Sequence, residues 1–373
     1  MRGRYGILIG LAAVMLAMGV WRGLREHPGA GAQPARGLPA PASAERDSNQ
    51  VLPEAAADVG AGKTVDGVAC IPAKTPAPDK PDKPDATVQA EMADIRGRWL
   101  ASTNPEHLVA AALLLRQPDD RTAPVRRALE TGGDSLVVVW NAARICSAAK
   151  DQDACPADKL AERLIAIDPL NSETWMFAAV QRLKRGDEAG ALAAVQRAGA
   201  APESRIYWAE TIALLERAYA AASDYGFGER ATAAMGVASA NLPHYSDYTS
   251  LCAKQSQASQ AWAYACLGYG ELAERRGDTM LGESIARGMQ KTALRQLGDQ
   301  AKLAEVVARG DLVEAERMDA VADRDVDALI FSTPGLLADY LDVLSQQGES
   351  AALRWRRAEA TRLRAELPPC APN

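Results

Sequence analysis

The amino-acid sequence predicts an all-α protein: an irregular superhelix of stacked helical hairpins, behind an N-terminal membrane segment and a disordered linker. The first observation is that apolar residues recur every three or four positions from about 87 to 367, as in amphipathic helices. The second is an uncharged run at residues 5–21. The third is a Gly-Asp pair, which suits a joint between helices because glycine accepts the left-handed conformation and aspartate caps the next helix. This pair recurs at 133–134, 186–187, 277–278, 298–299 and 310–311.

The uncharged run follows Arg2 and Arg4, and its apolar centre spans 7–20. This centre is shorter than the ~20 residues that cross a bilayer comfortably, which favours a signal peptide. The small-residue site at 17–19 is a poor cleavage site, however, because Trp21-Arg22 follows at once. We therefore expect a single-pass anchor in the inner membrane, with the bulk of the chain in the periplasm. Secretion after signal cleavage is the alternative.

Residues 22–86 are rich in Ala, Pro, Gly and Asp and almost free of aromatic residues, so they cannot form a core. The stretch TPAPDKPDKPD at 75–85 is typical of an extended, solvated spacer. The domains expected are an anchor or signal at 1–21, a disordered linker at 22–86, a helical-repeat domain at 87–367 and a tail at 368–373. The linker either tethers the domain away from the membrane or has no length requirement.

Local signals place several helix boundaries. Asn104-Pro105-Glu106 and Thr333-Pro334 are typical helix starts, because proline is tolerated in the first turn. The run LVVVW at 136–140 is the one strand-like stretch. We predict a helix there, because residues 141–149 continue in helical period.

The clearest hairpin lies at 171–202. Ser172 is the expected N-cap of its first helix, and Gly186-Asp187 separates that helix from the second. Trp175 is expected to be its most buried aromatic residue, filling the space between the two helices and the preceding hairpin.

This hairpin resembles the tetratricopeptide repeat, whose pattern is W-x2-L-G-x2-Y, then A-x3-F, then proline. The matching positions over 172–202 are Trp175, Ala178, Ala179, Ala191, Val195 and Pro202. Arg182 stands where the pattern has tyrosine. A weaker match covers 134–169, where Ala157 and Pro169 fall at repeat positions. The resemblance implies helical hairpins that stack and bind a peptide or another protein.

Six cysteines behind an export signal indicate disulfides. Cys146 ends one predicted helix and Cys155 precedes the next, so the intervening turn brings them together. Cys252 and Cys266 are symmetric about Ser259, at the turn of another predicted hairpin. The remaining pair, Cys70 and Cys370, would join the two tails. Free thiols in a cytosolic protein are the alternative.

The sequence shows no constellation that indicates catalysis, a metal or a cofactor. His107 lies in the first turn of a helix, where a structural role is expected, and His244 could be a base oriented by Asp247 or a plain loop histidine. Glu283 lies in GESIARGMQ, which resembles two motifs of lytic transglycosylases. In that family a much longer segment separates the motifs, so Glu283 is expected to be a helix-surface carboxylate.

Charge is unevenly distributed along the C-terminal part. Residues 311–327 are acidic and residues 354–364 are rich in arginine. We expect the basic stretch to be the solvated face of a terminal helix, with Leu353, Ala360, Leu363 and Leu367 turned inward. An anionic partner or membrane surface is the alternative. The formal net charge of −6 gives no support for nucleic-acid binding.

Together these features predict a membrane-tethered, exported scaffold that is not an enzyme and mediates protein–protein interaction in the cell envelope. Its partner would be an envelope protein or peptide of unknown identity, and residues 5–21 would contact the membrane. One alternative is a cell-wall-active enzyme, a glycan hydrolase or lyase on a helical superhelix. Another is a membrane-bound folding factor for a secreted client, although the R-x-x-F-D-Y signature of lipase foldases is absent.

Overall fold

The computed structural model describes residues 86–132, 135–243, 245–321, 329–331 and 333–367. Over these residues the chain is helical, with fifteen α-helices, one short 3-10 helix and no β-strand. This confirms the all-α prediction. The predictions for 1–21, for the linker up to 85, for Cys70 and Cys370 and for the tail at 368–373 lie outside the described residues. Within them, no helix is long and apolar enough to cross a membrane.

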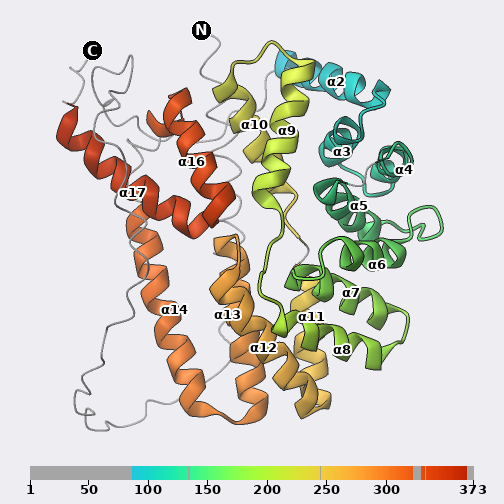
Figure 1. Cartoon of the computed structure of the whole chain (residues 1–373), viewed down its shortest axis with the longest axis vertical. Helices are drawn as coiled ribbons and strands as arrows, with labels where there is room; N and C mark the ends of the chain where they lie inside the picture. The colour runs from blue at the N-terminus through green and yellow to red at the C-terminus, as the bar shows by residue number, and fades with distance from the viewer. Residues whose placement is uncertain (1–85, 133–134, 244, 322–328, 332, 368–373) are drawn as a thin grey trace.

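The first helices follow one another along one side of the molecule (Figure 1). From α3 to α8, each α-helix packs against the next one in the chain. This arrangement matches the expected series of neighbouring hairpins. The elements are α2 Ala86–Ala101, α3 Pro105–Leu114, η2 Asp119–Arg121, α4 Thr122–Glu130, α5 Leu136–Ala148, α6 Ala157–Ile167, α7 Ser172–Lys184 and α8 Glu188–Ala200.

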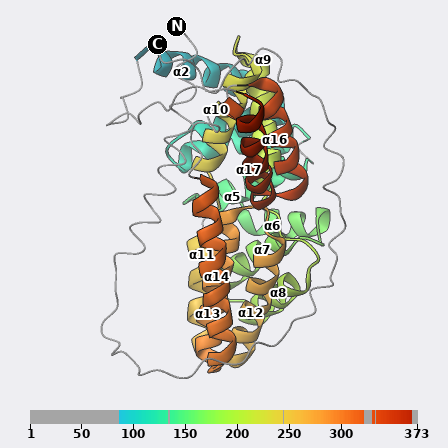
Figure 2. The same cartoon turned by 90° about the vertical axis from the view of Figure 1, so that its left-hand side faces the viewer.

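The series of helices α2 to α8 is called the column below. After α8 the chain runs back beside this column, and α9 packs against α2, α3 and α5. The C-terminal hairpin, formed by α16 and α17, lies beside α9 and α10 at the same end of the molecule, where α16 packs against both (Figure 2). Segments far apart in sequence therefore share one core. These elements are α9 Trp208–Ala222, α10 Phe227–Ala240, α16 Pro334–Gln347 and α17 Glu349–Glu366.

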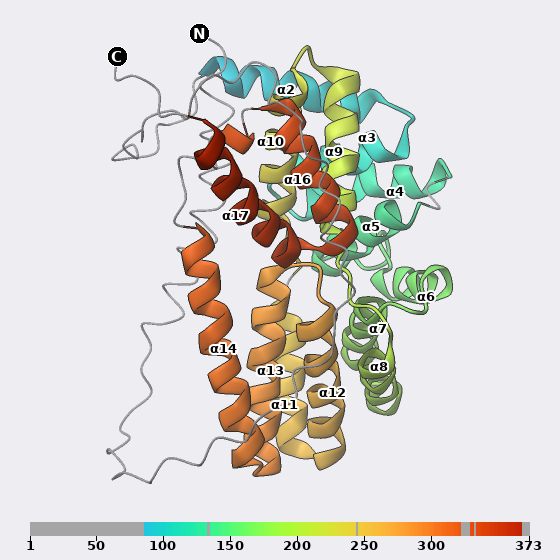
Figure 3. The ribbon, with the colours of Figure 1, turned by 60° about the vertical axis from the view of Figure 1, so that its left-hand side comes forward.

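Four further helices stand nearly parallel at the other end (Figure 3). In this bundle α12 packs against α8, and α11 packs against α7. The α7–α8 hairpin, which ends the column, therefore lies between α6 and the bundle. The four helices are α11 Tyr245–Ala258, α12 Gln260–Arg276, α13 Met280–Leu297 and α14 Gln300–Val321.

Most of the local boundary predictions are confirmed. The side chain of Asn104 caps α3, and LVVVW lies in helix α5. Gly186 has φ 81°, and the Asp187 side chain accepts a hydrogen bond from the Gly190 N–H at 2.9 Å. Gly298 has φ 73° and ends α13.

Two boundary predictions are wrong. The Gly-Asp pair at 310–311 lies within α14, because the neighbouring residues favour helix strongly enough to continue through it. The N-cap of α7 is Asn171 rather than Ser172: the Asn171 side chain accepts the Glu173 N–H at 3.1 Å. The pair at 133–134 lies outside the described residues.

The prediction for Trp175 is also wrong. Trp175 is only partly buried: its Nε1 donates to the Pro169 carbonyl at 2.7 Å, and the Arg197 guanidinium lies 5.1 Å from its ring. The core-facing positions of α7 hold Met176 and Phe177 instead, which are almost fully buried. Ala178 and Ala179, at repeat positions, are fully buried as the pattern expects, so the departure from the pattern is at Trp175.

Both predicted hairpin disulfides are present. The Cα atoms of Cys146 and Cys155 lie 5.1 Å apart, and those of Cys252 and Cys266 lie 5.7 Å apart. All four side chains are buried. Each bond closes the turn between two consecutive helices, as the sequence predicts.

The orientation expected for the terminal basic helix is confirmed for most of its residues. In α17, Leu353, Ala360 and Leu363 are buried, and Leu367, directly after the helix, is partly buried. Arg354, Arg357 and Arg364 are exposed, whereas Arg356 and Arg362 are only partly exposed.

Candidate functional site

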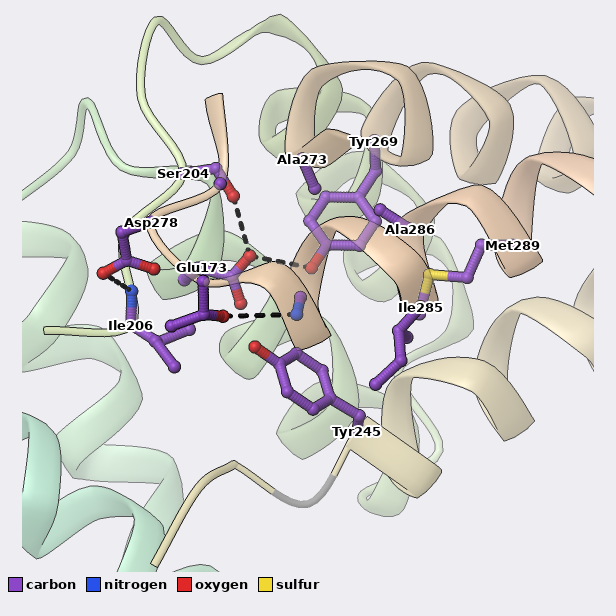
Figure 4. Close-up of a pocket in the computed structure, with 13 residues that line it drawn as sticks. Glu173, Ser204, Ile206, Tyr245, Tyr269, Ala273, Asp278, Ile285, Ala286 and Met289 are labelled. Carbon is purple, nitrogen blue, oxygen red and sulfur yellow. Dashed lines mark hydrogen bonds between the residues drawn. The ribbon is translucent and has the colours of Figure 1, made fainter. Parts of the chain in front are cut away.

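A polar centre lies where α7 meets α12. Glu173 is in the first turn of α7 and is 2% exposed. Its Oε1 accepts hydrogen bonds from Ser204 Oγ at 2.9 Å and from the Tyr269 hydroxyl at 2.8 Å (Figure 4). Its Oε2 is buried and has no hydrogen-bond partner among the described residues. Burial raises the pKa of Glu173, and the two hydrogen bonds partly offset this rise.

A second carboxylate, Asp278, lies in the link between α12 and α13. Its Oδ2 accepts the main-chain N–H of Ile206 at 3.0 Å. Burial raises the pKa of Asp278 to about 7, and the nearby Glu173 charge contributes to the rise. The sequence predicts Asp278 as a helix cap, but Thr279 has that role: its hydroxyl accepts the Gly282 N–H at 3.2 Å. Asp278 instead joins segments that are far apart in sequence.

The cavity between these groups is small. It offers about 10 Å³ to the centre of a water molecule, which is room for about one water. Tyr245 and Tyr269 approach Glu173 from two sides (Figure 4), and burial raises the pKa of both hydroxyls far above the usual range. A substrate does not fit here, so we interpret the centre as a polar junction that ties α7, α12 and α13 together.

The segment 201–207 completes the junction. It pairs with Asn171 through Glu203 and with Gly277 through Ser204. Tyr207 at its end has φ 56°, a left-handed conformation that a bulky residue adopts only when its surroundings hold it. The Tyr207 hydroxyl donates to Asp168 and accepts the Asn171 Nδ2–H, the latter at 2.7 Å.

A larger groove opens at the corner of α4, α5 and α6. Its volume is about 210 Å³. The Cys146–Cys155 disulfide forms part of its wall, so one predicted cysteine pair lies at a cavity. Its lining is Arg126, Leu129, Cys146, Ala154, Cys155, Pro156, Lys159, Leu160 and Arg163. The sequence predicts the disulfide but not the groove, because Arg126 and Leu129 come from a different helix.

Glu283 is not the surface carboxylate that the sequence suggests. Its side chain is 14% exposed and pairs with Arg317 of α14. It also accepts a hydrogen bond from Ser350 Oγ of α17 at 2.7 Å. Burial raises the pKa of Glu283, while Ser350 and Arg317 lower it. The side chain is mostly covered because α14, the next helix in the chain, and the start of α17, which is distant in sequence, both lie against α13.

Of the two candidate histidines, only His107 is described, and no second reactive group joins it among the described residues. His107 Nδ1 lies 3.1 Å from Ser102 Oγ, in the turn that starts α3. Burial lowers the pKa of His107, and the charge of Glu106 partly opposes this. His244 lies outside the described residues. Its suggested orienting group, Asp247, forms a surface ion pair with Lys184 at 3.3 Å.

No protein-family model, curated protein or solved structure is significantly similar to this chain. The match of 172–202 to the tetratricopeptide repeat thus remains a resemblance in residues and spacing. Its two helices are present as α7 and α8, joined at Gly186-Asp187.

Proposed function

We propose that this chain is a membrane-tethered, exported helical scaffold that binds another protein in the cell envelope. The observation that carries the proposal is the pair of disulfides, Cys146–Cys155 and Cys252–Cys266, each closing a helical hairpin. Structural disulfides persist in oxidising compartments such as the periplasm and are rare in the cytosol. The two disulfides therefore support the part of the proposal that puts the helical domain in an oxidising space.

The scaffold role follows from how the hairpins are arranged. Helices α3 to α8 pack in series, and we interpret them as an irregular superhelix of tetratricopeptide-like hairpins. Series of this kind offer extended surfaces that bind peptides or proteins. The groove at the corner of α4, α5 and α6 is one concave part of that surface.

The N-terminal part supplies the tether. Residues 5–21 would anchor the chain in the inner membrane, and the Pro- and Ala-rich linker up to 86 would hold the helical domain in the periplasm. A tethered scaffold searches only the space within reach of its linker, which raises its effective concentration toward partners in the envelope.

Two experiments test this proposal. Alkaline phosphatase fused after Lys63 should be active, and a cytosolic reporter at the same site should be inactive. The reverse result would exclude an exported domain. A photo-crosslinking amino acid, p-benzoylphenylalanine, is then placed singly at exposed positions on different faces of the full chain. A discrete partner band that depends on the export segment is expected, and its absence at every position would contradict the scaffold role.

A further inference from the structure

We propose that Arg121 and Arg144 form a binding site for a phosphate-type oxyanion, at the point where the end of α10 meets α3 and α5. The ligand would be inorganic phosphate or the phosphate group of a small phosphomonoester. This inference goes beyond the proposed function, because a protein-binding scaffold does not require a small-molecule site. Phosphate binding can be measured without export or a protein partner, so its failure would leave the proposed function standing.

The two guanidinium groups converge on one residue, Asn241, which caps the C-terminus of α10. Arg121 Nη1 donates to the Asn241 side-chain Oδ1 at 3.0 Å, and Arg144 Nη2 donates to the Asn241 main-chain carbonyl. Arg121 lies in η2 and Arg144 in α5, so the two cations reach this point from different elements. They lie close enough together that the charge of Arg121 lowers the pKa of Arg144.

No carboxylate of the described residues pairs with either arginine. Burial lowers the pKa of Arg144 to about 10, and the charges that also act on it come from Tyr248, Tyr245 and Arg121. Burial lowers the pKa of Arg121 as well, with no nearby carboxylate to raise it. The fold therefore partly buries two neighbouring positive charges without an acidic partner.

Two aspartates precede Arg121 directly in the chain, but neither bonds to it. Asp119 Oδ1 accepts the Lys150 main-chain N–H at 3.2 Å, and its Oδ2 lies 3.9 Å from Lys150 Nζ. The Asp120 side chain is exposed. Neither aspartate contributes to the pKa of Arg121, so neither supplies the counter-charge.

Main-chain carbonyls offset only part of the positive charge. Arg121 Nε donates to the Leu115 carbonyl at 2.6 Å, at the end of α3, and Arg144 donates to the carbonyl at the end of α10. A helix C-terminus carries roughly half a negative charge, so these two ends offset about one of the two positive charges. Arg144 Nε is buried and has no hydrogen-bond partner among the described residues. A bound anion would balance the remaining charge.

The arrangement favours a tetrahedral oxyanion over a carboxylate. A guanidinium has five N–H donors in a planar fork, and the hydrogen bonds of Arg121 and of Arg144 use only two in each case. A planar carboxylate aligns both oxygens with one fork, whereas phosphate presents oxygens to two forks in different directions. Both arginines are partly exposed, so the ligand can arrive from solvent and the alcohol part of a phosphomonoester can stay in water.

The direct test is equilibrium dialysis of the full chain, in nonionic detergent, against radiolabelled inorganic phosphate at constant ionic strength. Saturable retention is expected. Arg121→Gln should weaken binding at least about tenfold, as for the loss of a charge-assisted hydrogen bond. Arg144→Lys keeps the charge but removes the planar fork, and it should weaken binding as well. Arg295→Gln, at an exposed arginine of α13, is the matched control and should bind like the wild type.

Thermal unfolding separates a ligand site from simple capping of helix ends. Phosphate that binds only the folded state raises the unfolding temperature, and this rise should be lost in Arg121→Gln when phosphate is compared with chloride at equal ionic strength. If the arginines only cap helix ends, Arg121→Gln lowers the unfolding temperature equally in both salts, which would overturn the proposal. Circular dichroism verifies that each variant is folded, and Arg121→Gln alone decides the outcome if Arg144→Lys does not fold.

Other results would also overturn the proposal. These are no retention of millimolar phosphate by the wild type, or equal retention by the wild type and Arg121→Gln. Displacement of phosphate by an equal concentration of acetate would show a carboxylate site instead. Competition by glycerol 2-phosphate distinguishes the two sources of the ligand: tighter binding than phosphate identifies a phosphomonoester, and weaker binding identifies free phosphate.

Discussion

The main-chain N–H of Ile206 donates a hydrogen bond to Asp278 Oδ2 at 3.0 Å, across 72 residues of sequence. The Asp278 carbonyl in turn accepts the N–H of Glu349 at 2.9 Å, and the Glu349 carboxylate accepts the Met280 N–H at 2.7 Å. The segment after α8, the α12–α13 link and the start of α17 therefore meet at one aspartate. Asp278 is thus one point at which the first helices, the bundle and the C-terminal hairpin are joined.

This junction predicts a pH-dependent stability. The folded pKa of Asp278, about 7, is raised from 3.8, so the folded state holds a proton that the unfolded state has lost. The stabilisation that this bound proton provides is fully present below about pH 4 and is lost as pH rises through 7. Over that range the unfolding free energy falls by at most ~1.4 kcal/mol per pH unit. Asp278→Asn keeps an oxygen for Ile206 and removes the charge. Urea unfolding from pH 4 to 8 should therefore show a flatter profile in the variant.

Asp339→Asn, at an exposed position of α16, is the control and should keep the wild-type pH profile. The raised pKa of Glu173 acts in the same direction, so some slope should remain in Asp278→Asn. An unchanged slope in Asp278→Asn would show that the carboxyl of Asp278 is not the titrating group.

The second prediction concerns Tyr269, which donates to buried Glu173 Oε1 at 2.8 Å. Tyr269→Phe removes this donor from a carboxylate that already has one unpartnered oxygen. The expected loss of unfolding free energy is ~1.5–3 kcal/mol, the range for a hydrogen bond to a charged group. Tyr264→Phe in the same helix is the matched control, because Tyr264 is 62% exposed. Equal effects of the two variants would contradict the role of the junction.

The third prediction compares two tryptophans. Trp140 is fully buried, with Tyr207 at 5.3 Å and Phe177 at 6.3 Å between ring centroids. Trp140→Ala should cost ~3–5 kcal/mol in chemical denaturation, as for a large core side chain. Trp175→Ala should cost less than half as much, because its ring lies at the edge of the hairpin. A larger loss of unfolding free energy for Trp175→Ala than for Trp140→Ala would instead support the repeat alignment, in which Trp175 is a core residue.

The fourth prediction concerns the disulfides. Cys146 and Cys155 are separated by 9 positions, and Cys252 and Cys266 by 14. Loop-closure entropy for such short loops predicts that replacing either pair by alanine costs ~2.5–3 kcal/mol. Guanidinium unfolding with and without reductant measures the loss, and non-reducing peptide mapping of exported protein gives the connectivity. A peptide that links Cys146 to Cys252, or free thiols throughout, would contradict the pairing.

Features determined by neighbouring residues could be predicted from the sequence alone. Helical spacing predicts the all-α class, and Asn104-Pro105 and Gly186-Asp187 predict a helix start and a joint. The two hairpin disulfides follow because each pair of cysteines flanks a single turn. In each case the interacting groups are a few residues apart, so local conformation brings them together.

Only the tertiary structure decided which side chains fill the core and which groups meet across the fold. Phe177 rather than Trp175 is buried, because the helices packed against α7 select its inward face. Glu173, Ser204 and Tyr269 converge from three segments, and Glu283 is covered by Arg317 and Ser350. The groove joins α4 to α6 in the same way. Contacts of this kind carry no local sequence signal, because their energy is gained only after distant helices have packed.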